Sequence, residues 1–348
     1  MKDFNTLILN GEKLNKTSLL EKCNKNQIRE AWEDDFWLFI EAWLNPQPYI
    51  DVKTSGSTGT PKLIQINKAK MLASAQLTCA FFNLKARDTA LLCMSAKNIG
   101  GMMMIVRALY AQLDLQLVKP QANPLKTLNK SIDFCAMVPY QIQSSLAENP
   151  EQLSLIKHLL IGGGTISSQL EEQIRLQDIE AYHSFGMTET ISHFALRKVG
   201  FEDYFTCLPG ITIEQDSYDT LQVFAPIFGK TPIQTNDIIE KISTSTFRWK
   251  GRLDFAIETG GIKVLPEMIE NMLAKQIDKR FFISALPDEK LNNRVILIIE
   301  GKPMQMPSNL FNELPPYHKP KEVHFVLKFE ETTSGKIDRL TTQAKLNL

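Results

Sequence analysis

The sequence has few cysteines and none of the patterns that build disulfide frameworks or zinc sites. Cysteine accounts for five of 348 residues. These are Cys23, Cys79, Cys93, Cys135 and Cys207, and no two of them form a CxxC pair. An odd number of widely spaced cysteines argues against both kinds of site, so we expect most of them to be small core side chains.

The sequence also lacks an excess of charge of either sign and a long apolar run. Lys plus Arg and Asp plus Glu each count 39, which gives no electrostatic reason to expect a nucleic acid as partner. The most apolar stretch, 100–118, contains Arg107 and Asp114, which disfavour a membrane span. The first residues are polar and have no signal-peptide core. These absences predict a reduced, soluble, cytoplasmic protein.

The remaining composition is that of a globular protein, with 43% hydrophobic and 22% charged residues. Its length favours two domains. Apolar runs at 91–94, 134–138 and 158–161 indicate buried strands, and helical patterns lie between them. One such pattern is formed by Met71, Leu72, Ala75, Cys79 and Phe82. This alternation of strands and helices predicts an α/β fold with a largely parallel sheet.

The last third of the chain follows a different pattern, with more strands and a second α+β block. Four ranges are typical of strands there: 221–224, 237–240, 295–299 and 323–326. Pro266 stands where a first helical turn tolerates proline, and Ile269, Met272 and Leu273 mark a buried helix face. We expect a large domain over residues 1–251 and a small domain over 252–348.

The most informative segment is the run of nine residues from Thr54 to Lys62. Its glycines, Gly56 and Gly59, allow close approach of the backbone to a ligand. The lysine and several hydroxyl groups supply donors to an anion. The run lacks the Gly-Lys-Ser/Thr ending of a Walker A loop, so a different phosphate-binding loop is indicated. A polar surface loop is the alternative interpretation of the run alone.

Residue for residue, this run resembles the signature loop of the adenylate-forming superfamily of acyl-CoA synthetases, aryl-CoA ligases, luciferases and peptide-synthetase adenylation domains. The resemblance implies that ATP phosphates bind to Thr54, Ser55, Gly56, Ser57, Thr58, Gly59, Thr60 and Lys62. It covers about Val52 to Arg339, and the protein is short for this superfamily. It implies a large domain with parallel sheets and a small mobile C-terminal domain.

Further motifs of the superfamily follow in the expected order. Ser184, Phe185 and Gly186, followed by Thr188 and Glu189, resemble its aromatic-Gly-x-Thr-Glu element. The resemblance implies an aromatic ring on adenine, a threonine on phosphate and a glutamate on Mg²⁺, for which carboxylate oxygen is a suitable ligand. Without the resemblance, Thr-Glu is also typical of a helix start.

Three later segments complete the resemblance. Thr235-Asn236-Asp237 resembles a Thr-Gly-Asp element whose aspartate accepts hydrogen bonds from ribose; Asn236 replaces glycine and would tolerate left-handed backbone. In Gly251-Arg252-Leu253-Asp254, Arg252 would reach ribose or phosphate and Asp254 would be the hinge between the domains. In 334–339, Lys336 would enter the site for adenylation.

The resemblance implies an acid–thiol ligase that uses ATP and Mg²⁺, forms an acyl-adenylate and passes the acyl group to coenzyme A. Its partners would be small molecules, namely a carboxylic acid, ATP and coenzyme A, with no nucleic acid and no membrane span. Homo-oligomerisation is left open. No catalytic nucleophile is needed, so none of the cysteines need act.

The segment 191–197 and the short length resemble the compact o-succinylbenzoate–CoA ligases of menaquinone biosynthesis. In that subgroup Gly162, Gly163 and Gly164 would let adenine and an aromatic acyl group lie against backbone. The acid has a second carboxylate, for which Lys97, His193 and Arg197 are candidate partners. Asn98 stands where many relatives have a histidine of the acyl pocket. Another aryl or fatty acid–CoA or carrier-protein ligase, and a non-catalytic nucleotide-binding relative, remain as alternatives.

Overall fold

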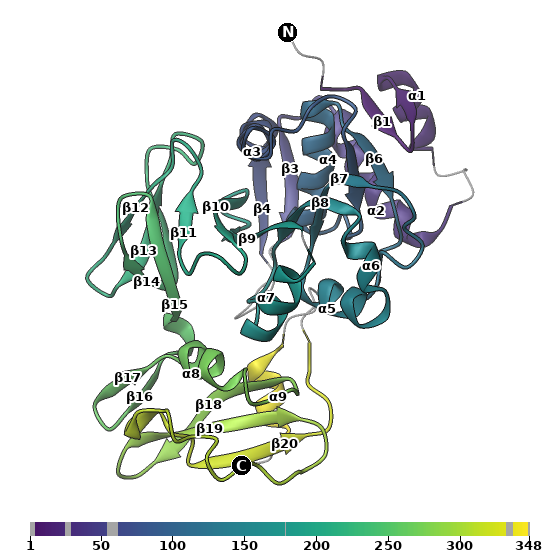
Figure 1. Ribbon diagram of the computed structural model, residues 1–348. Coiled ribbons are helices and arrows are strands. Elements are labelled where there is room, and N and C mark those ends of the chain that lie inside the picture. Colours follow the sequence, from purple (N-terminus) through teal and green to yellow (C-terminus); the bar gives the residue numbers. More distant parts are fainter. Residues whose placement is uncertain (1–3, 25–28, 54–61, 178, 332–336, 347–348) are drawn as a thin grey trace.

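The computed structural model describes residues 4–24, 29–53, 62–177, 179–331 and 337–346 (Figure 1). Within these residues, thirteen strands form one mixed sheet in the order β12-β13-β14-β15-β11-β10-β9-β8-β7-β5-β6-β1-β2. The strands are β1 (Leu7–Leu9), β2 (Glu12–Leu14), β5 (Thr89–Leu92), β6 (Asp114–Leu117), β7 (Ile132–Met137), β8 (Ile156–Ile161), β9 (Glu180–Met187), β10 (Ser192–Lys198), β11 (Phe205–Cys207), β12 (Thr212–Gln215), β13 (Thr220–Phe224), β14 (Ile233–Lys241) and β15 (Thr246–Arg252). A separate hairpin pairs β3 (Tyr49–Lys53) with β4 (Leu63–Asn67).

Helices cover both faces of the parallel part of this sheet. They are α1 (Lys16–Lys22), α2 (Ala31–Leu44), α3 (Lys68–Phe81), α4 (Ile99–Ala111), α5 (Pro139–Glu148), α6 (Pro150–Leu153) and α7 (Ser168–Arg175). Alternate side chains of β5 enter two different cores, because successive residues of a strand face opposite ways. Ala90 and Leu92 pack with α2, α3 and α4, whereas Leu91 packs with α5, α6 and α7.

The predicted parallel sheet is confirmed from β1 to β9, where neighbouring strands other than β2 run parallel. From β9 to β12 the neighbours are antiparallel, so the β-rich region beyond residue 205 extends the same sheet. The helix face predicted around Met71 and Ala75 is buried in α3.

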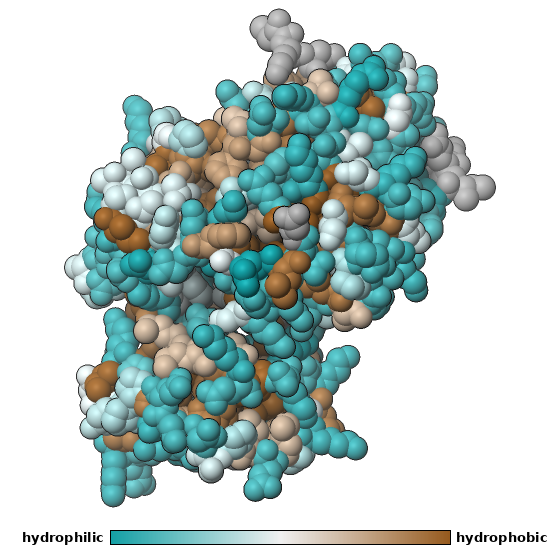
Figure 2. All heavy atoms as spheres, viewed as in Figure 1, coloured by the Kyte–Doolittle hydropathy of each residue, from teal (hydrophilic) through white to brown (hydrophobic). Residues whose placement is uncertain are grey.

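The residues from 253 onward form a smaller body below the large sheet (Figure 1). Its elements are η1 (Leu253–Phe255), β16 (Ile257–Thr259), β17 (Ile262–Val264), α8 (Pro266–Leu273), β18 (Phe281–Asp288), β19 (Asn292–Glu300), η2 (Pro316–His318), β20 (Glu322–Val326) and α9 (Arg339–Ala344). Strands β18, β19 and β20 make a separate sheet. The molecular surface narrows between the two bodies, and polar side chains cover much of the face shown (Figure 2).

One local prediction for this region was wrong. Met272 is 40% exposed, because the buried face of α8 is formed by Ile269 and Leu273 together with Pro266 and Glu267. In the large sheet, Asn236 lies within the extended strand β14, so it does not use the left-handed backbone that asparagine tolerates. The strands predicted at 295–299 and 323–326 are confirmed as parts of β19 and β20.

Candidate functional site

Four parallel strands, β5, β7, β8 and β9, end at the same edge of the large sheet. From β5 the chain moves to β6 on one side, and it then returns to β7 on the other side of β5. This reversal is a topological switch point, and open α/β sheets bind ligands outside the carboxyl ends of their strands at such a point. The loops after these strands contain Asn98, Gly162–Gly164 and Thr188, so the fold brings these predicted residues to one edge.

The glycine segment after β8 lies close to the neighbouring strand ends. The Gly162 amide donates to the carbonyl of Met137 at 3.0 Å, and the Ser184 hydroxyl donates to the carbonyl of Ile161 at 2.8 Å. A Cβ atom on Gly162 would stand 2.8 Å from the Ser184 Oγ. Gly163 has φ +82°, a conformation that disfavours other residues. The segment therefore presents a backbone without side chains of its own at the carboxyl edge.

The turn between β9 and β10 carries Thr188 and Glu189. Thr188 is buried, whereas Glu189 is exposed at the same edge of the sheet. The turn is fixed by the Thr190 hydroxyl, which accepts from the Met187 amide at 2.9 Å and lies 2.7 Å from the Ser192 carbonyl oxygen. Ile191 has φ +57°, which is strained for a β-branched residue. Gly186 is required here, since a Cβ would come within 2.2 Å of the Ser192 carbonyl oxygen.

Glu189 fits a magnesium ion that is shared with a phosphate ligand. Its carboxylate is solvent-exposed, and carboxylate oxygen is a hard ligand suited to Mg²⁺. Within the described part of the chain there is no group of three or more His, Cys, Asp or Glu side chains that could hold a metal by themselves. One protein carboxylate with phosphates and water completing the shell is the usual arrangement for Mg²⁺.

Phe185 lies in an aromatic cluster beside this turn. Its ring contacts Phe194, Phe205 and Phe247 with ring centroids 5.8, 5.2 and 5.2 Å apart. The ring is half-buried by these contacts. Its place on an adenine stays a prediction.

Asp237 and Arg252 come together at the last paired residues of β14 and β15. Asp237 is buried, accepts from the Trp249 Nε1 at 2.9 Å and has an oxygen 3.8 Å from the Arg252 guanidinium. Arg252 also donates to Asp254, with Nε 3.1 Å from Oδ2. Both oxygens of Asp237 therefore face nitrogen donors of β15, and this pair lies next to the predicted hinge.

Two of the predicted partners for a second carboxylate are already paired with acids. Lys97 forms a salt bridge with Asp35 at 3.2 Å, with its side chain 75% exposed. Arg197 forms an ion pair with Glu171 and donates to the carbonyl of Glu202 at 2.8 Å. Asn98 precedes α4 as its N-cap residue without a side-chain cap bond.

Arg197 also supports the glycine segment through a histidine. The Arg197 guanidinium lies 3.3 Å from the His183 Nδ1, and the His183 Nε2 lies 3.0 Å from the Gly164 carbonyl oxygen. Burial and the charge of Arg197 lower the pKa of His183 to about 3. The neutral ring therefore accepts from Arg197 and donates to Gly164. Arg197, which is itself paired with Glu171, thus positions His183 against the glycine segment.

His193 lies in a buried polar group that contains a residue the sequence did not single out as a site. The Arg107 guanidinium of α4 lies 3.4 Å from the His193 Nδ1, and the Thr78 hydroxyl of α3 lies 3.2 Å from the His193 Nε2. Burial, with the charge of Arg107, holds the pKa of His193 well below its usual range. His193 is therefore neutral and cannot attract an anion by charge.

Arg107 is a cation in the core of the large body, and it is only 1% exposed. No described carboxylate forms a salt bridge with it, and its Nε has no hydrogen-bond partner among the described residues. Burial lowers its pKa to about 10, so the side chain remains charged at neutral pH. A buried charge without a counter-charge is costly. A single arginine within an apolar helix was the sequence signal for this residue.

Arg107 lies near the strand ends. Its partner His193 is paired with Gly186 across β9 and β10, two residues before Thr188. The cationic group is therefore held behind the turn that carries Thr188 and Glu189.

Two predicted groups fall outside the described residues. These groups are the run from Thr54 to Thr60 and the residue Lys336, and their roles stay predictions. Lys62 is described and immediately precedes β4.

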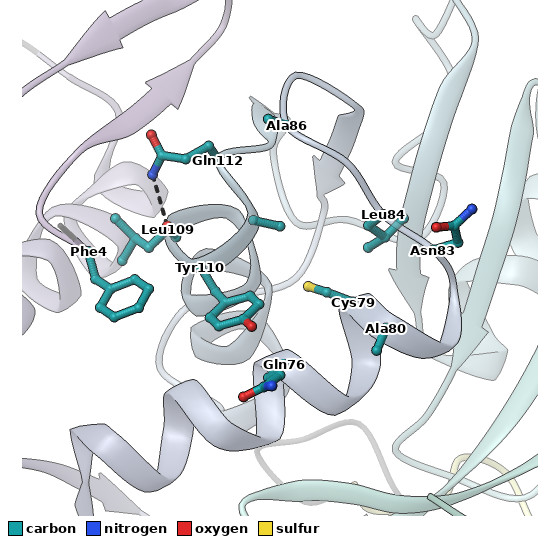
Figure 3. Close-up of a pocket in the computed structure, with 11 residues that line it drawn as sticks. Phe4, Gln76, Cys79, Ala80, Asn83, Leu84, Ala86, Leu109, Tyr110 and Gln112 are labelled. Atoms are coloured by element: carbon teal, nitrogen blue, oxygen red, sulfur yellow. Dashed lines mark hydrogen bonds between the residues drawn. The ribbon is translucent and has the colours of Figure 1, made fainter. Parts of the chain in front are cut away.

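A hollow of about 450 Å³ lies elsewhere on the large body (Figure 3). Its walls come from the last turns of α3 and α4 and from Phe4, whose ring stacks on Tyr110 with centroids 5.9 Å apart. Helix α3 leads into β5 and α4 leads into β6, so the last turns of both helices lie next to the amino ends of these strands. The hollow therefore lies at the amino edge of the sheet. It does not contain the predicted site residues.

Comparisons with known proteins agree with this geometry. A family model described as AMP-binding enzyme matches residues 21–213. A crystal structure of an acyl-CoA synthetase (AMP-forming)/AMP-acid ligase II-like protein from Dyadobacter fermentans is 32% identical, with a TM-score of 0.63, and the match covers 96% of this chain and 99% of that one. An o-succinylbenzoate coenzyme A synthetase from Bacillus subtilis, in complex with ATP and magnesium, has a TM-score of 0.73 at 20% identity, covering 84% and 69% of the two chains.

Curated relatives include the 2-succinylbenzoate–CoA ligase of Escherichia coli, which is 27% identical over 71% of this chain. The corresponding ligase of Haemophilus influenzae is 26% identical over 79%. The chain spans 57% of the length of the first of these relatives and 67% of the second. Among the helices of the described residues, none has the length and apolarity needed to cross a membrane.

Proposed function

Because this chain belongs to the AMP-binding enzyme family, we propose that it activates a carboxylic acid with ATP as an acyl-adenylate and transfers the acyl group to coenzyme A. The gathering of Gly162–Gly164, Thr188 and Glu189 at the carboxyl edge of the sheet, around its switch point, supports this reaction class.

The first half of the reaction converts a poor electrophile into a good one. The substrate carboxylate attacks the α-phosphorus of ATP, pyrophosphate leaves, and the former carboxylate oxygen becomes part of a good leaving group, AMP. The protein then needs to position the reactants and to neutralise charge. Residues 54–62 would hold the leaving phosphates, Asp237 the ribose hydroxyls, and Arg252 and Lys336 the developing charge. Magnesium bound at Glu189 would supply charge neutralisation on the phosphates.

In the second half, the thiolate of coenzyme A attacks the acyl carbon and releases AMP. We propose that residues 252–348 act as a small domain that rotates about Asp254 between the halves, which withdraws Lys336 and admits the thiol. A few backbone torsions are enough for such a hinge.

We propose o-succinylbenzoate as the acid, which would place the product in menaquinone biosynthesis. The single observation that carries this assignment is Arg107, a buried cation without an acidic partner among the described residues. We propose that this guanidinium receives the second carboxylate of an acid whose first carboxylate reacts with ATP. The activity of the curated ligases of Escherichia coli and Haemophilus influenzae supports the same acid. The requirement for a second carboxylate distinguishes it from benzoate and fatty acids.

The test is pyrophosphate release with ATP and Mg²⁺ over a panel of acids, with and without coenzyme A. The expected result is turnover selective for o-succinylbenzoate, a coenzyme A thioester as product, and loss of turnover in Lys336→Ala. Turnover with a different acid would refute the assigned substrate and keep the reaction. Thioester formation only on a carrier-protein thiol would refute coenzyme A as acceptor. Absence of turnover with every acid would favour a non-catalytic nucleotide-binding protein.

A further inference from the structure

Asn236 makes a side-chain contact that its position in the motif does not require. Its Nδ2 donates to the Asp254 Oδ1 at 2.7 Å, which joins β14 of the large sheet to η1 at the start of the small body. The asparagine is exposed, and its backbone is extended within β14. Backbone conformation does not explain the asparagine that stands here in place of glycine, whereas its amide group makes a specific contact with Asp254.

The carboxylate of Asp254 is held on both oxygens. Asn236 holds Oδ1, while Arg252 holds Oδ2 through its Nε at 3.1 Å and its Nη2 at 2.5 Å. Arg252 is shared, because its guanidinium also lies 3.8 Å from Asp237. Both acids compete for one arginine, whereas the Asn236 amide contacts only the hinge carboxylate among the bonds described.

A nucleotide would change this arrangement. Any anion that draws the Arg252 guanidinium away from Asp254 leaves the Asn236 amide as the remaining donor to that carboxylate among the described contacts. Rotation about 253–255 would then have to break one neutral-to-charged hydrogen bond. Such a bond is stronger than a neutral pair and has a defined direction.

We propose that Asn236 is a positioning residue that fixes the hinge carboxylate of Asp254 and so holds the small body in the orientation seen in the structure. This inference rests on the proposed function for its link to two half-reactions, but the contact itself can be tested without substrate. Asn236 acts through Asp254 and touches neither ATP nor the acid. Loss of its amide should favour other orientations of the small body.

The first experiment measures amide hydrogen exchange in peptides that contain residues 252–256, on the full chain without substrate. Asn236→Gly and Asn236→Asp should both raise exchange there about three- to tenfold, the effect of losing one hydrogen bond. Asn236→Asp is the sharper variant, because it keeps the side-chain size and places a second carboxylate against Asp254. The double variant that combines Asn236→Asp with Asp254→Asn swaps the two groups. It restores an amide–carboxylate pair and should return exchange toward the wild-type rate.

Gln234→Gly is the matched control. Gln234 lies two residues earlier on the same face of β14 and its amide also forms side-chain bonds, at 2.7 Å to Thr220 and 3.1 Å to Asp216, away from the hinge. It should leave exchange at 252–256 unchanged. Wild-type exchange in both Asn236 variants, or an equal rise in Gln234→Gly, would overturn the proposal.

The second experiment separates the two half-reactions. Asn236→Gly should leave ATP–pyrophosphate exchange within about twofold and change the rate at which preformed acyl-adenylate is consumed by coenzyme A by about three- to tenfold, with the KM for the acid unchanged. Equal loss in both half-reactions would mean a merely structural residue and would overturn the proposal. Absence of pyrophosphate exchange in the wild-type protein would refute the proposed function, while the hydrogen-exchange result would still decide the role of Asn236.

Discussion

Glu267 of α8 lies beside Gly251 of the large sheet, and the effect of its buried carboxyl group on the free energy of unfolding can be tested quantitatively. Its carboxyl group stands at the start of α8, 5% exposed, and its Oε2 has no hydrogen-bond partner among the described residues. A Cβ atom on Gly251 of β15 would come within 2.6 Å of that oxygen. Arg339 of α9 faces this region but forms a bidentate pair with Glu270, at 2.8 Å for each bond.

Burial raises the pKa of Glu267 from 4.5 to about 7, against the lowering effect of Arg339, and Glu270 raises it further. Below pH 4.5 the carboxyl is protonated in both the folded and the unfolded chain and has no effect on stability. Between pH 4.5 and 7 the unfolded chain releases its proton first, so the free energy of unfolding falls as pH rises. A difference of two to three pKa units at about 1.4 kcal/mol each makes this loss about 3 kcal/mol above pH 7.

Glu267→Gln replaces the protonated form by a neutral amide of the same shape. We expect it to match the wild type near pH 4.5 and to exceed it by about 3 kcal/mol at pH 8. The assay is urea unfolding at half-unit pH steps, followed by far-ultraviolet circular dichroism. Glu258→Gln, on an exposed position of the small body, is the control and should shift stability equally little at every pH. The stability difference between variant and wild type should grow between pH 5 and 8. If it does not grow, or if the variant is less stable than the wild type at pH 8, Glu267 is not a buried carboxyl with a raised pKa.

Three further outcomes follow from the site. Arg107→Met should raise the free energy of unfolding by about 1–4 kcal/mol, measured by chemical unfolding, because it removes an uncompensated buried charge. In initial-rate measurements it should raise the KM for o-succinylbenzoate at least about tenfold but leave the KM for benzoate unchanged. Equal KM changes for both acids would contradict the role given to Arg107. Arg197→Ala should lower stability by about 1–3 kcal/mol and leave the KM for the acid unchanged, since Arg197 holds Glu171 and His183; a large KM effect with no loss of stability would reverse this interpretation. Gly186→Ala should cost about 3 kcal/mol or more by pressing a methyl group against the Ser192 carbonyl, and a thermal melt that matches wild type would show that the turn can rearrange.

Much of the fold could be predicted from the sequence because its signals are local. The apolar runs at 134–138 and 158–161 and the helix face around Met71 depend on periodicity, and each lies where the pattern indicated. The prediction for Met272 was wrong because it needed non-local information. Packing against β15 and β18 decides which of the two adjacent apolar residues of α8 turns inward, and no local pattern encodes that packing.

The same distinction applies to the candidate site. Motifs of consecutive residues could be found directly, and the structure brings Gly162–Gly164, Thr188 and Glu189 to one edge. The partner of a second carboxylate could not be found in this way. Lys97 and Arg197 attracted attention as charges near motifs, yet their acids come from α2 and α7, distant in sequence. Arg107 becomes informative only when its burial and the absence of a described acidic partner are known.

The pairing of β14 with β15 ends at Asp237 and Arg252, and the next three residues form a single turn of 3₁₀-helix. A 3₁₀-helix advances about 120° per residue, so the number of residues in this turn sets the angular phase of everything that follows. One inserted residue would therefore turn the small body by about a third of a revolution relative to the carboxyl edge of the large sheet. Three inserted residues would restore the phase at a greater separation. Linker length thus sets, together with the contact between Asn236 and Asp254, which face of the small body is presented to the site.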